Sequence, residues 1–270
     1  MNKILLAFDG ANVSGGAFEF ARRLNEQEPI LLVGAFLPQT DLSASWSYNA
    51  GEGPLHIPAV ESSVSEMISE NMLQFEAVCK SNDIECRIHE HFHQLAMPEL
   101  VKETRFANLL IVGSEKFFGG DTAYLTDLLH DAECPVLVLP EEFSWPEQLV
   151  LAYDGSQASV FAIRQFCYLF PGLCGLPATL VYVGPANDKD GSLPDEPYVE
   201  ELAAGLFSNL DIRHLELDSR NGFAAWLSGL PAPLLISGSF GRSLLSQAFR
   251  ESFAQKVVDY QLIPVFIAHK

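Results

Sequence analysis

The chain has 270 residues, which is enough for one or two domains of ordinary size. Apolar residues make up 48% and charged residues 19%, a composition that supports a buried core and argues against intrinsic disorder. The formal charge of −19 repels phosphate backbones at long range and so disfavours nonspecific nucleic-acid binding.

Short apolar runs alternate with helical patterns along the chain. In the first half we expect strands at 3–9, 30–36, 84–91, 108–113 and 135–140, and helices at 13–27, about 61–81, 97–106 and 121–132. In the second half we expect strands at 148–153, 178–183, 212–217, 233–238 and 263–268, and helices at 157–170, 197–208, 221–228 and 243–260. The run Ile30-Leu31-Leu32-Val33 is apolar without alternation, which is typical of strands covered on both faces of a parallel sheet. Each half is therefore predicted to be an open α/β domain.

The chain is internally duplicated. Three motifs occur in both halves in the same order: LAFDG at 6–10 and LAYDG at 151–155, LLIVGS at 109–114 and LLISGS at 234–239, CPVLV at 134–138 and IPVFI at 263–267. We predict two α/β domains, 1–142 and 147–270, joined by a short polar linker that carries a proline.

Cysteine usage and hydropathy both favour a cytoplasmic protein. The five cysteines form no CxxC pair and no zinc-like spacing, which fits buried thiols in a reducing compartment: Cys79, Cys86, Cys134, Cys167 and Cys174. The N-terminus reaches Asp9 too early for a signal peptide. A charge-free stretch, 165–187, is long enough to cross a bilayer, but prolines and glycines interrupt its middle. We therefore expect a helix end, a turn and a buried strand there, and no membrane partner.

Two irregular segments, 38–60 and 184–197, follow the second strand of their halves. Both should lie at the carboxyl edge of the sheet, where loops line ligand crevices in open α/β folds. The same loops are the expected contact surfaces for an unknown protein partner.

The best candidate for ligand chemistry follows the strand at 233–238. Gly238-Ser239-Phe240-Gly241 joins this strand to a helix, so its amides and the helix N-terminus suit a phosphate, with Arg242 and Arg250 nearby as further donors. The alternative is that these glycines only permit a tight turn.

These motifs resemble those of the universal stress protein family. The family is characterised by a strand ending in Asp-Gly, a Gly-x2-Gly-x9-Gly-Ser/Thr segment after the fourth strand, and Cys-Pro-Val before the last. The resemblance covers essentially the whole chain and implies, for each half, a five-stranded parallel sheet in the order 3-2-1-4-5 flanked by helices. It also implies that the halves are related by a pseudo-twofold axis, packing through their last strands, 135–140 and 263–268, like the dimer of single-domain relatives.

One branch of the family binds ATP or AMP and another does not. The resemblance assigns a nucleotide site in the second half to Asp154, Val183, Gly238, Gly241 and Ser252. Glu251 stands where the family has a glycine, directly before the final Ser/Thr of the motif. If its carboxylate pointed at a polyphosphate, the repulsion between two like charges about 4 Å apart would cost about 4 kcal/mol at an effective dielectric of 20. AMP, adenosine or a magnesium-shielded nucleotide would tolerate this change better than bare ATP.

The first half departs further from the family pattern. Only 22 residues separate Gly113 from Pro135, against 26 from Gly238 to Pro264, and Asp121 stands where a helix N-cap is expected. Residues 1–143 also carry a net charge of −14, against −5 for residues 144–270. We predict that the first half binds no polyphosphate.

Other polar residues have weaker claims to chemistry. Asp9 and Asp154 could each contact a ligand or merely cap the turn that follows their strand. His89, His91 and His93 would share one face of a strand, so a neighbouring pair could chelate zinc, but strand-end histidines without a metal are the favoured interpretation. No catalytic residue is predicted, and a slow ATPase ranks last because no general base is evident.

The resemblance thus implies a cytoplasmic, nucleotide-responsive binding protein of stress adaptation, with no dedicated turnover. The alternative is a scaffold that binds no nucleotide and acts through protein partners. Chains could also associate further as homodimers.

Overall fold

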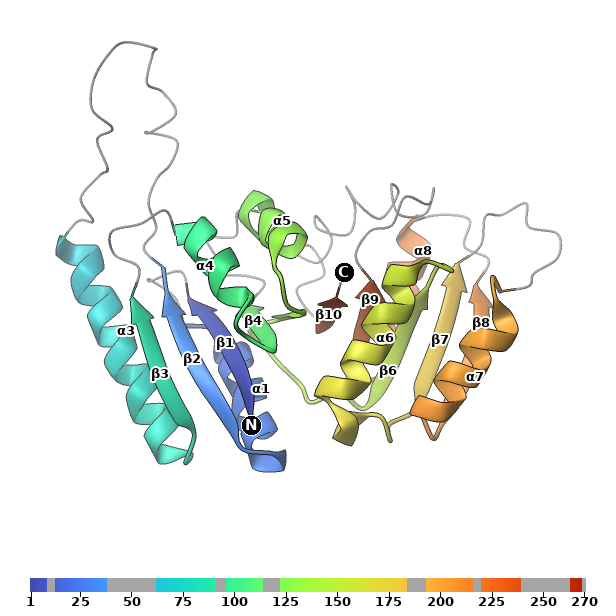
Figure 1. Cartoon of the computed structure of the whole chain (residues 1–270), viewed down its shortest axis with the longest axis horizontal. Coiled ribbons are helices and arrows are strands. Elements are labelled where there is room, and N and C mark those ends of the chain that lie inside the picture. The colour runs from blue at the N-terminus through green and yellow to red at the C-terminus, as the bar shows by residue number, and fades with distance from the viewer. Residues whose placement is uncertain are drawn as a thin grey trace, which may run out of the picture.

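The computed structural model describes residues 1–8, 13–37, 62–90, 96–113, 122–183, 193–215, 220–238 and 263–268. The strands of the first half, in blue to green on the left of Figure 1, are β1 (Asn2–Phe8), β2 (Ile30–Phe36), β3 (Glu85–Glu90), β4 (Leu109–Gly113) and β5 (Val136–Leu139). The strands of the second half are β6 (Gln148–Tyr153), β7 (Ala178–Val183), β8 (Leu210–Leu215), β9 (Pro233–Gly238) and β10 (Val265–Ala268).

Helices connect these strands. Those of the first half are α1 (Gly15–Gln27), α3 (Ser62–Ser81), α4 (Ala96–Thr104) and α5 (Thr122–Asp131). Those of the second half are α6 (Gln157–Leu169), the short 3-10 helix η2 (Pro171–Leu173), α7 (Glu196–Leu206) and α8 (Arg220–Ser228). The expected helix at 243–260 and the loop at 38–60 lie outside the described residues.

The strands form one sheet across both halves, in the order β3-β2-β1-β4-β5-β10-β9-β6-β7-β8. Each half therefore has the expected order 3-2-1-4-5, and neighbouring strands within each half run parallel. The five-stranded sheets of the two halves join into this single sheet, because β5 and β10 pair antiparallel with Leu137 opposite Phe266. This pairing satisfies backbone groups that two open edges would leave unpaired, and it confirms that the last strands join the halves.

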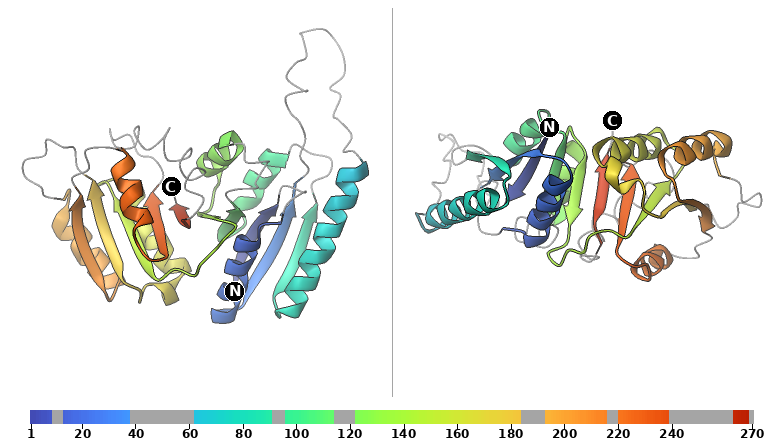
Figure 2. Two further views of the ribbon diagram at one scale, coloured as in Figure 1. Left: turned by 180° about the vertical axis from the view of Figure 1, so that it is seen from behind. Right: turned by 90° about the horizontal axis from the view of Figure 1, so that it is seen from below.

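Side chains on both faces of the sheet are buried, as continuous apolar strands require. Along β1, Ile4, Leu6 and Phe8 pack into one hydrophobic cluster, whereas Leu5 and Ala7 pack into another. The first cluster lies under α1, α3, α6 and α7, and the second under α4, α5 and α8. The view from below in Figure 2 shows helices on both sides of the strands.

The third strand of the second half begins earlier in the chain than the sequence predicts. β8 covers Leu210–Leu215 instead of 212–217, because it is an edge strand whose exposed and partly buried residues alternate. Alternation on an edge strand weakens the apolar signal that marks a strand's start.

The charge-free stretch at 165–187 is confirmed over its described part as the end of α6, η2 and β7. In the described parts of the chain, no helix is both long and apolar enough to cross a bilayer.

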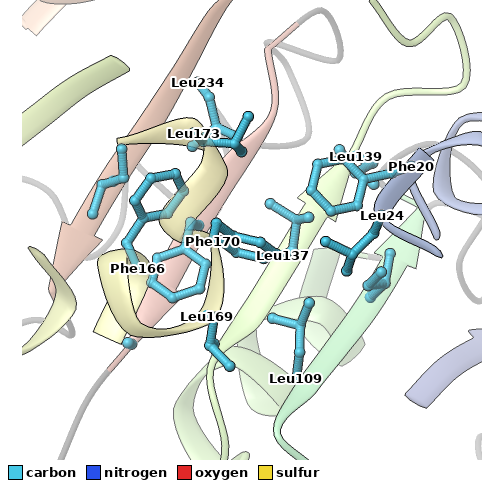
Figure 3. Packing of buried hydrophobic residues seen from close by; sticks show 14 of the residues in the cluster. Phe20, Leu24, Leu109, Leu137, Leu139, Phe166, Leu169, Phe170, Leu173 and Leu234 are labelled. Atoms are coloured by element: carbon cyan, nitrogen blue, oxygen red, sulfur yellow. The ribbon is translucent and has the colours of Figure 1, made fainter. Parts of the chain in front are cut away.

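An aromatic cluster joins the halves beside the β5–β10 pair. Phe20 of α1 stacks on Trp145 of the linker, with ring centroids 5.3 Å apart, and meets Phe143 and Phe170 edge-on, each at 5.7 Å. Figure 3 shows Phe20 and Leu24 on one side of Leu137 and Phe166 and Phe170 on the other. We call Phe20, Phe143, Trp145 and Phe170 the joint cluster. It fixes the linker against both halves, since its rings come from α1, the linker and the end of α6.

Helix α1 carries a charge network whose contribution should depend on pH. Glu19 accepts hydrogen bonds from Arg22 and Arg23, and the Arg22 bond contributes most to lowering the pKa of its carboxyl to about 2 from 4.5. The ionised Glu19 carboxylate therefore stabilises the folded protein fully above about pH 4.5, and this stabilisation is lost as the pH falls toward 2. Because the Glu19 side chain is 35% exposed, we expect only about 1 kcal/mol.

Urea unfolding of the Glu19→Gln variant across this pH range checks the expectation. The variant should be less stable than the parent at neutral pH, and the two should converge near pH 2. A difference that stays constant down to that pH would mean that the Glu19 charge contributes nothing.

Candidate functional site

Asp154, Val183 and Gly238 lie together at the carboxyl edge of the second half. They end, or directly follow, the neighbouring strands β6, β7 and β9. The register pairs Leu151 with Ile236 and Tyr153 with Tyr182, which brings the three residues to the same level of the sheet. The strand order reverses between β6 and β9, since β6 continues through α6 to one side and β9 lies on the other. Ligands of open α/β folds bind in the crevice outside such a point.

The carboxylate of Asp154 shapes the turn into α6. Its Oδ1 accepts a hydrogen bond of 2.9 Å from the Ser156 amide, and the Ser156 hydroxyl in turn accepts one of 3.1 Å from the Ser159 amide. Gly155 between them has a φ of +77°, a conformation that L side chains rarely adopt. The capping interpretation of Asp154 is thereby confirmed. One amide uses only one of about four lone-pair positions of a carboxylate, so the group can still accept a ligand hydroxyl.

Tyr153 holds the segment before α7 over this turn. Its phenol donates a 2.8 Å hydrogen bond to the Pro194 carbonyl, and a Cβ at Gly155 would lie 2.8 Å from the Pro194 Cβ. Burial raises the pKa of the Tyr153 phenol, and the carboxylates of Asp195 and Asp154 add to the rise. The phenol therefore stays a hydrogen-bond donor, and Pro194 stays packed above Gly155. Sequence reasoning missed both residues, because it took 184–197 only as an irregular segment.

Gly238 is required by the packing of α6 against β9. A Cβ at this position would lie 2.3 Å from the carbonyl carbon of Ala158 and 2.4 Å from the Ser159 amide nitrogen. The first turn of α6 therefore crosses directly over the end of β9. The close packing of α6 on β9 is enough to require a glycine at this position. The sequence suggested two other reasons, phosphate binding and a tight turn.

The structure describes only part of the proposed site. Val183 ends β7 opposite Leu215 of β8, at the carboxyl edge of the sheet. Gly241, Ser252 and the replacement Glu251 lie outside the described residues, together with Arg242, Arg250 and Asp9.

In the described part of the first half, the protein's own groups lie close to the end of β4 and to the start of α1. A Cβ at Gly113, the counterpart of Gly238, would lie 2.6 Å from the Ser14 Cβ. Glu141 of the linker accepts a 3.1 Å hydrogen bond from the Gly15 amide, at the N-terminus of α1. A carboxylate there satisfies a helix donor and complements the helix dipole.

Glu141 is thus an internal anion at the start of α1, a different helix end from the start of α5, where the sequence predicts Asp121. Asp121 itself lies outside the described residues, so its predicted capping role stays a prediction. Glu141 follows β5 and is 126 residues from its partner, and no local pattern signals such a contact.

The histidine cluster is only partly described. The Nδ1 of His89 lies 2.9 Å from Glu103 Oε1 of α4, so this ring pairs with a carboxylate. His91 and His93 lie outside the described residues. Within the described ranges, no three histidine, cysteine or acidic side chains gather as metal ligands would.

Comparisons with known proteins identify the fold. Over its whole length, the chain is similar to the crystal structure of a universal stress protein from Archaeoglobus fulgidus DSM 4304, with a TM-score of 0.65 and 16% sequence identity over 96% of that chain. Neither the comparison with protein-family models nor the comparison with curated proteins finds a match. The chain therefore has the fold of a universal stress protein, as its motifs predicted.

Proposed function

We propose that this chain is a cytoplasmic binding protein of stress adaptation that holds ATP or AMP at the carboxyl ends of β6, β7 and β9. The observation that carries the proposal is that Asp154 and Gly238 flank the point where the strand order of the second half reverses. The likeness to a universal stress protein supports the stress-response part. No dedicated turnover is proposed.

The described residues fit a nucleoside better than they fit a polyphosphate. Asp154 offers carboxylate acceptor positions, which suit the hydroxyl groups of a ribose. The end of β7 at Val183 offers backbone groups at the adjacent edge. The acidic character of the chain disfavours a bare triphosphate, and Mg²⁺ bound to the nucleotide would offset it. The phosphates would be held by Gly241 and Ser252.

A thermal-shift titration with AMP, adenosine and Mg-ATP tests the proposal. A ligand at 100 times its Kd should stabilise the folded protein by about 2.7 kcal/mol. Asp154→Asn is the informative variant, because an amide oxygen can still accept from the Ser156 amide while the charge is lost. We expect it to fold like the parent and to bind about 10–100-fold more weakly, as loss of a charged hydrogen bond predicts.

Asp154→Ala is the matched control, since it removes both the turn bond and the ligand acceptor. Equal affinity of the parent and both variants would show that Asp154 only caps the turn. A flat titration of the parent with all three ligands would refute nucleotide binding.

A scaffold without nucleotide is the second candidate, and one observation favours it. Pro194 packs on Gly155 and is held by Tyr153, so the protein itself covers part of the edge beside Asp154. In that case the loops 38–60 and 184–197 would contact a protein partner. A flat titration together with a partner that binds the purified chain and is lost on loop substitution would support it.

A further inference from the structure

The outermost strand of the first half, β3, has a free edge. It lies at one end of the ten-stranded sheet and pairs parallel with β2 on one side only. Figure 1 shows it as the last strand on the left, with α3 beside it. Backbone groups along such an edge can pair with another strand, and the chain already joins two edges in this way at β5 and β10. A further strand can therefore dock on β3.

Two opposite charges are exposed on one face of β3. Glu85 and Arg87 are two residues apart, so their side chains project from the same face of the strand. Cys86 between them points to the opposite face, where it packs against the core together with Ile88. Among the described residues, neither Glu85 nor Arg87 has an ion-pair partner. Both charges are therefore available to groups outside the chain.

The order of these charges is self-complementary in an antiparallel pair. When two copies of β3 pair with Cys86 opposite Cys86, Glu85 of each copy lies opposite Arg87 of the other. The Cβ atoms of directly opposite residues are about 4.5–5.5 Å apart, which is close enough for an ion pair. The twofold axis runs between the two Cys86 residues, so both ion pairs form at once. One strand supplies both sides of the contact, as a closed dimer requires.

Helix α3 would extend this contact. It packs against β3 and β2, and a twofold axis perpendicular to the sheet places its copy on the same face of the joined sheet. Two apolar side chains of α3 are exposed, Met67 by 45% and Leu73 by 67%, so the helix offers apolar area in addition to strand pairing. The net charge of −14 on residues 1–143 opposes the approach of two copies. Salt screens this repulsion beyond about 8 Å, whereas opposite charges in contact are screened much less.

The other free edge, β8, has the same order of charges but uses them within the chain. Asp211 and Arg213 are two residues apart and exposed, and Arg213 Nε lies 2.6 Å from Asp211 Oδ2. This internal pair must be broken before either group can pair with a second copy. Over the part of the chain that the structure describes, β3 has no such pair to break. The charges therefore favour β3 as the contact edge.

We propose that two copies of this chain associate through β3, which pairs antiparallel with itself and continues the sheet from one copy into the other. The observation that carries the proposal is the order Glu85-Cys86-Arg87 on a free edge strand. The partner is a second copy because this order of charges is complementary to itself.

Sedimentation equilibrium of the full chain and its charge variants tests the proposal. At about 100 µM, which populates a dimer of micromolar Kd, the parent should approach twice the monomer mass of 29.7 kDa. Glu85→Arg and Arg87→Glu each place like charges opposite one another, so each should weaken the dimer by about 10-fold or more. The Glu85→Arg/Arg87→Glu variant restores opposite charges and should dimerise like the parent. A mixture of the two single variants should also dimerise, because one supplies two arginines and the other two glutamates.

Arg213→Glu is the matched control, because it changes the equivalent charge on the β8 edge. It should leave the dimer unchanged. A monomeric parent would overturn the proposal, and so would single β3 variants that dimerise as tightly as the parent. Weaker association of Arg213→Glu, with masses above that of a dimer, would show that β3 pairs with β8 of the next copy and would overturn self-pairing.

Amide hydrogen exchange locates the contact. Exchange over residues 84–89 should be slower in the parent at about 100 µM than at about 1 µM, since pairing protects the amides of the free edge. It should show no such dependence on concentration in the Arg87→Glu variant. A parent that dimerises without any change in this exchange would have its interface elsewhere, and β3 pairing would be refuted.

Discussion

Replacement of Phe20 with alanine is expected to lower the free energy of unfolding by about 3–5 kcal/mol, as for other large-to-small substitutions of buried phenylalanine. Phe20 is 0% exposed and contacts Phe143, Trp145 and Phe170 at once. Its loss would leave a cavity between α1, the linker and the end of α6, which the surrounding backbone cannot fill. Since most domains are stable by only about 5–15 kcal/mol, this is a large share of the total.

Urea unfolding followed by circular dichroism measures this effect. Tyr168→Ala is the control, because Tyr168 lies on α6 close to the joint cluster in sequence but is 74% exposed. It should change the stability by no more than about 0.5 kcal/mol. Equal small effects of the two substitutions would show that the joint cluster does not hold the halves together.

The Gly238→Ala variant should be destabilised by about 1–3 kcal/mol or more and should lose ligand binding as well. Its new Cβ would meet backbone atoms of Ala158 and Ser159 at 2.3–2.6 Å, so the first turn of α6 must move away from β9. That turn carries the Ser156 cap that Asp154 supports. Stability and the proposed nucleotide affinity should therefore fall together.

Gly205→Ala is the control, because we expect it to raise the free energy of unfolding instead of lowering it. Gly205 is exposed on α7, and nothing lies within 4 Å of a Cβ built there. Alanine should stabilise the protein by about 0.4–1 kcal/mol, because it restricts the unfolded chain without a clash. Thermal unfolding of both variants separates the two mechanisms. A Gly238→Ala protein as stable as the parent would contradict the packing that the structure shows.

The sequence predicted most of the architecture because the relevant signals are local or repeated. Uninterrupted apolar runs such as Leu234-Leu235-Ile236 identified strands buried on both faces. The strand order came from the family resemblance. The shift of β8 shows the limit of this approach, because an exposed edge strand carries a weaker pattern.

The site was predictable only in outline. Asp154, Val183 and Gly238 could be placed at one edge, since they end strands whose order the family implies. The contact of Gly238 with α6 could not, because it depends on how closely a helix crosses a strand 80 residues away in sequence. The carboxylate of Glu141 at the α1 N-terminus likewise depends on a contact between distant segments.

The sequence by itself determined the duplicated α/β plan, since burial on both faces and the repeated motifs are written in residue order. Only the tertiary structure decided that the two sheets become one and that Glu141 reaches α1. These features are contacts between segments whose proximity no local pattern encodes. They arise when edge backbone groups and the unpaired amides of a helix N-terminus find partners as the whole chain packs.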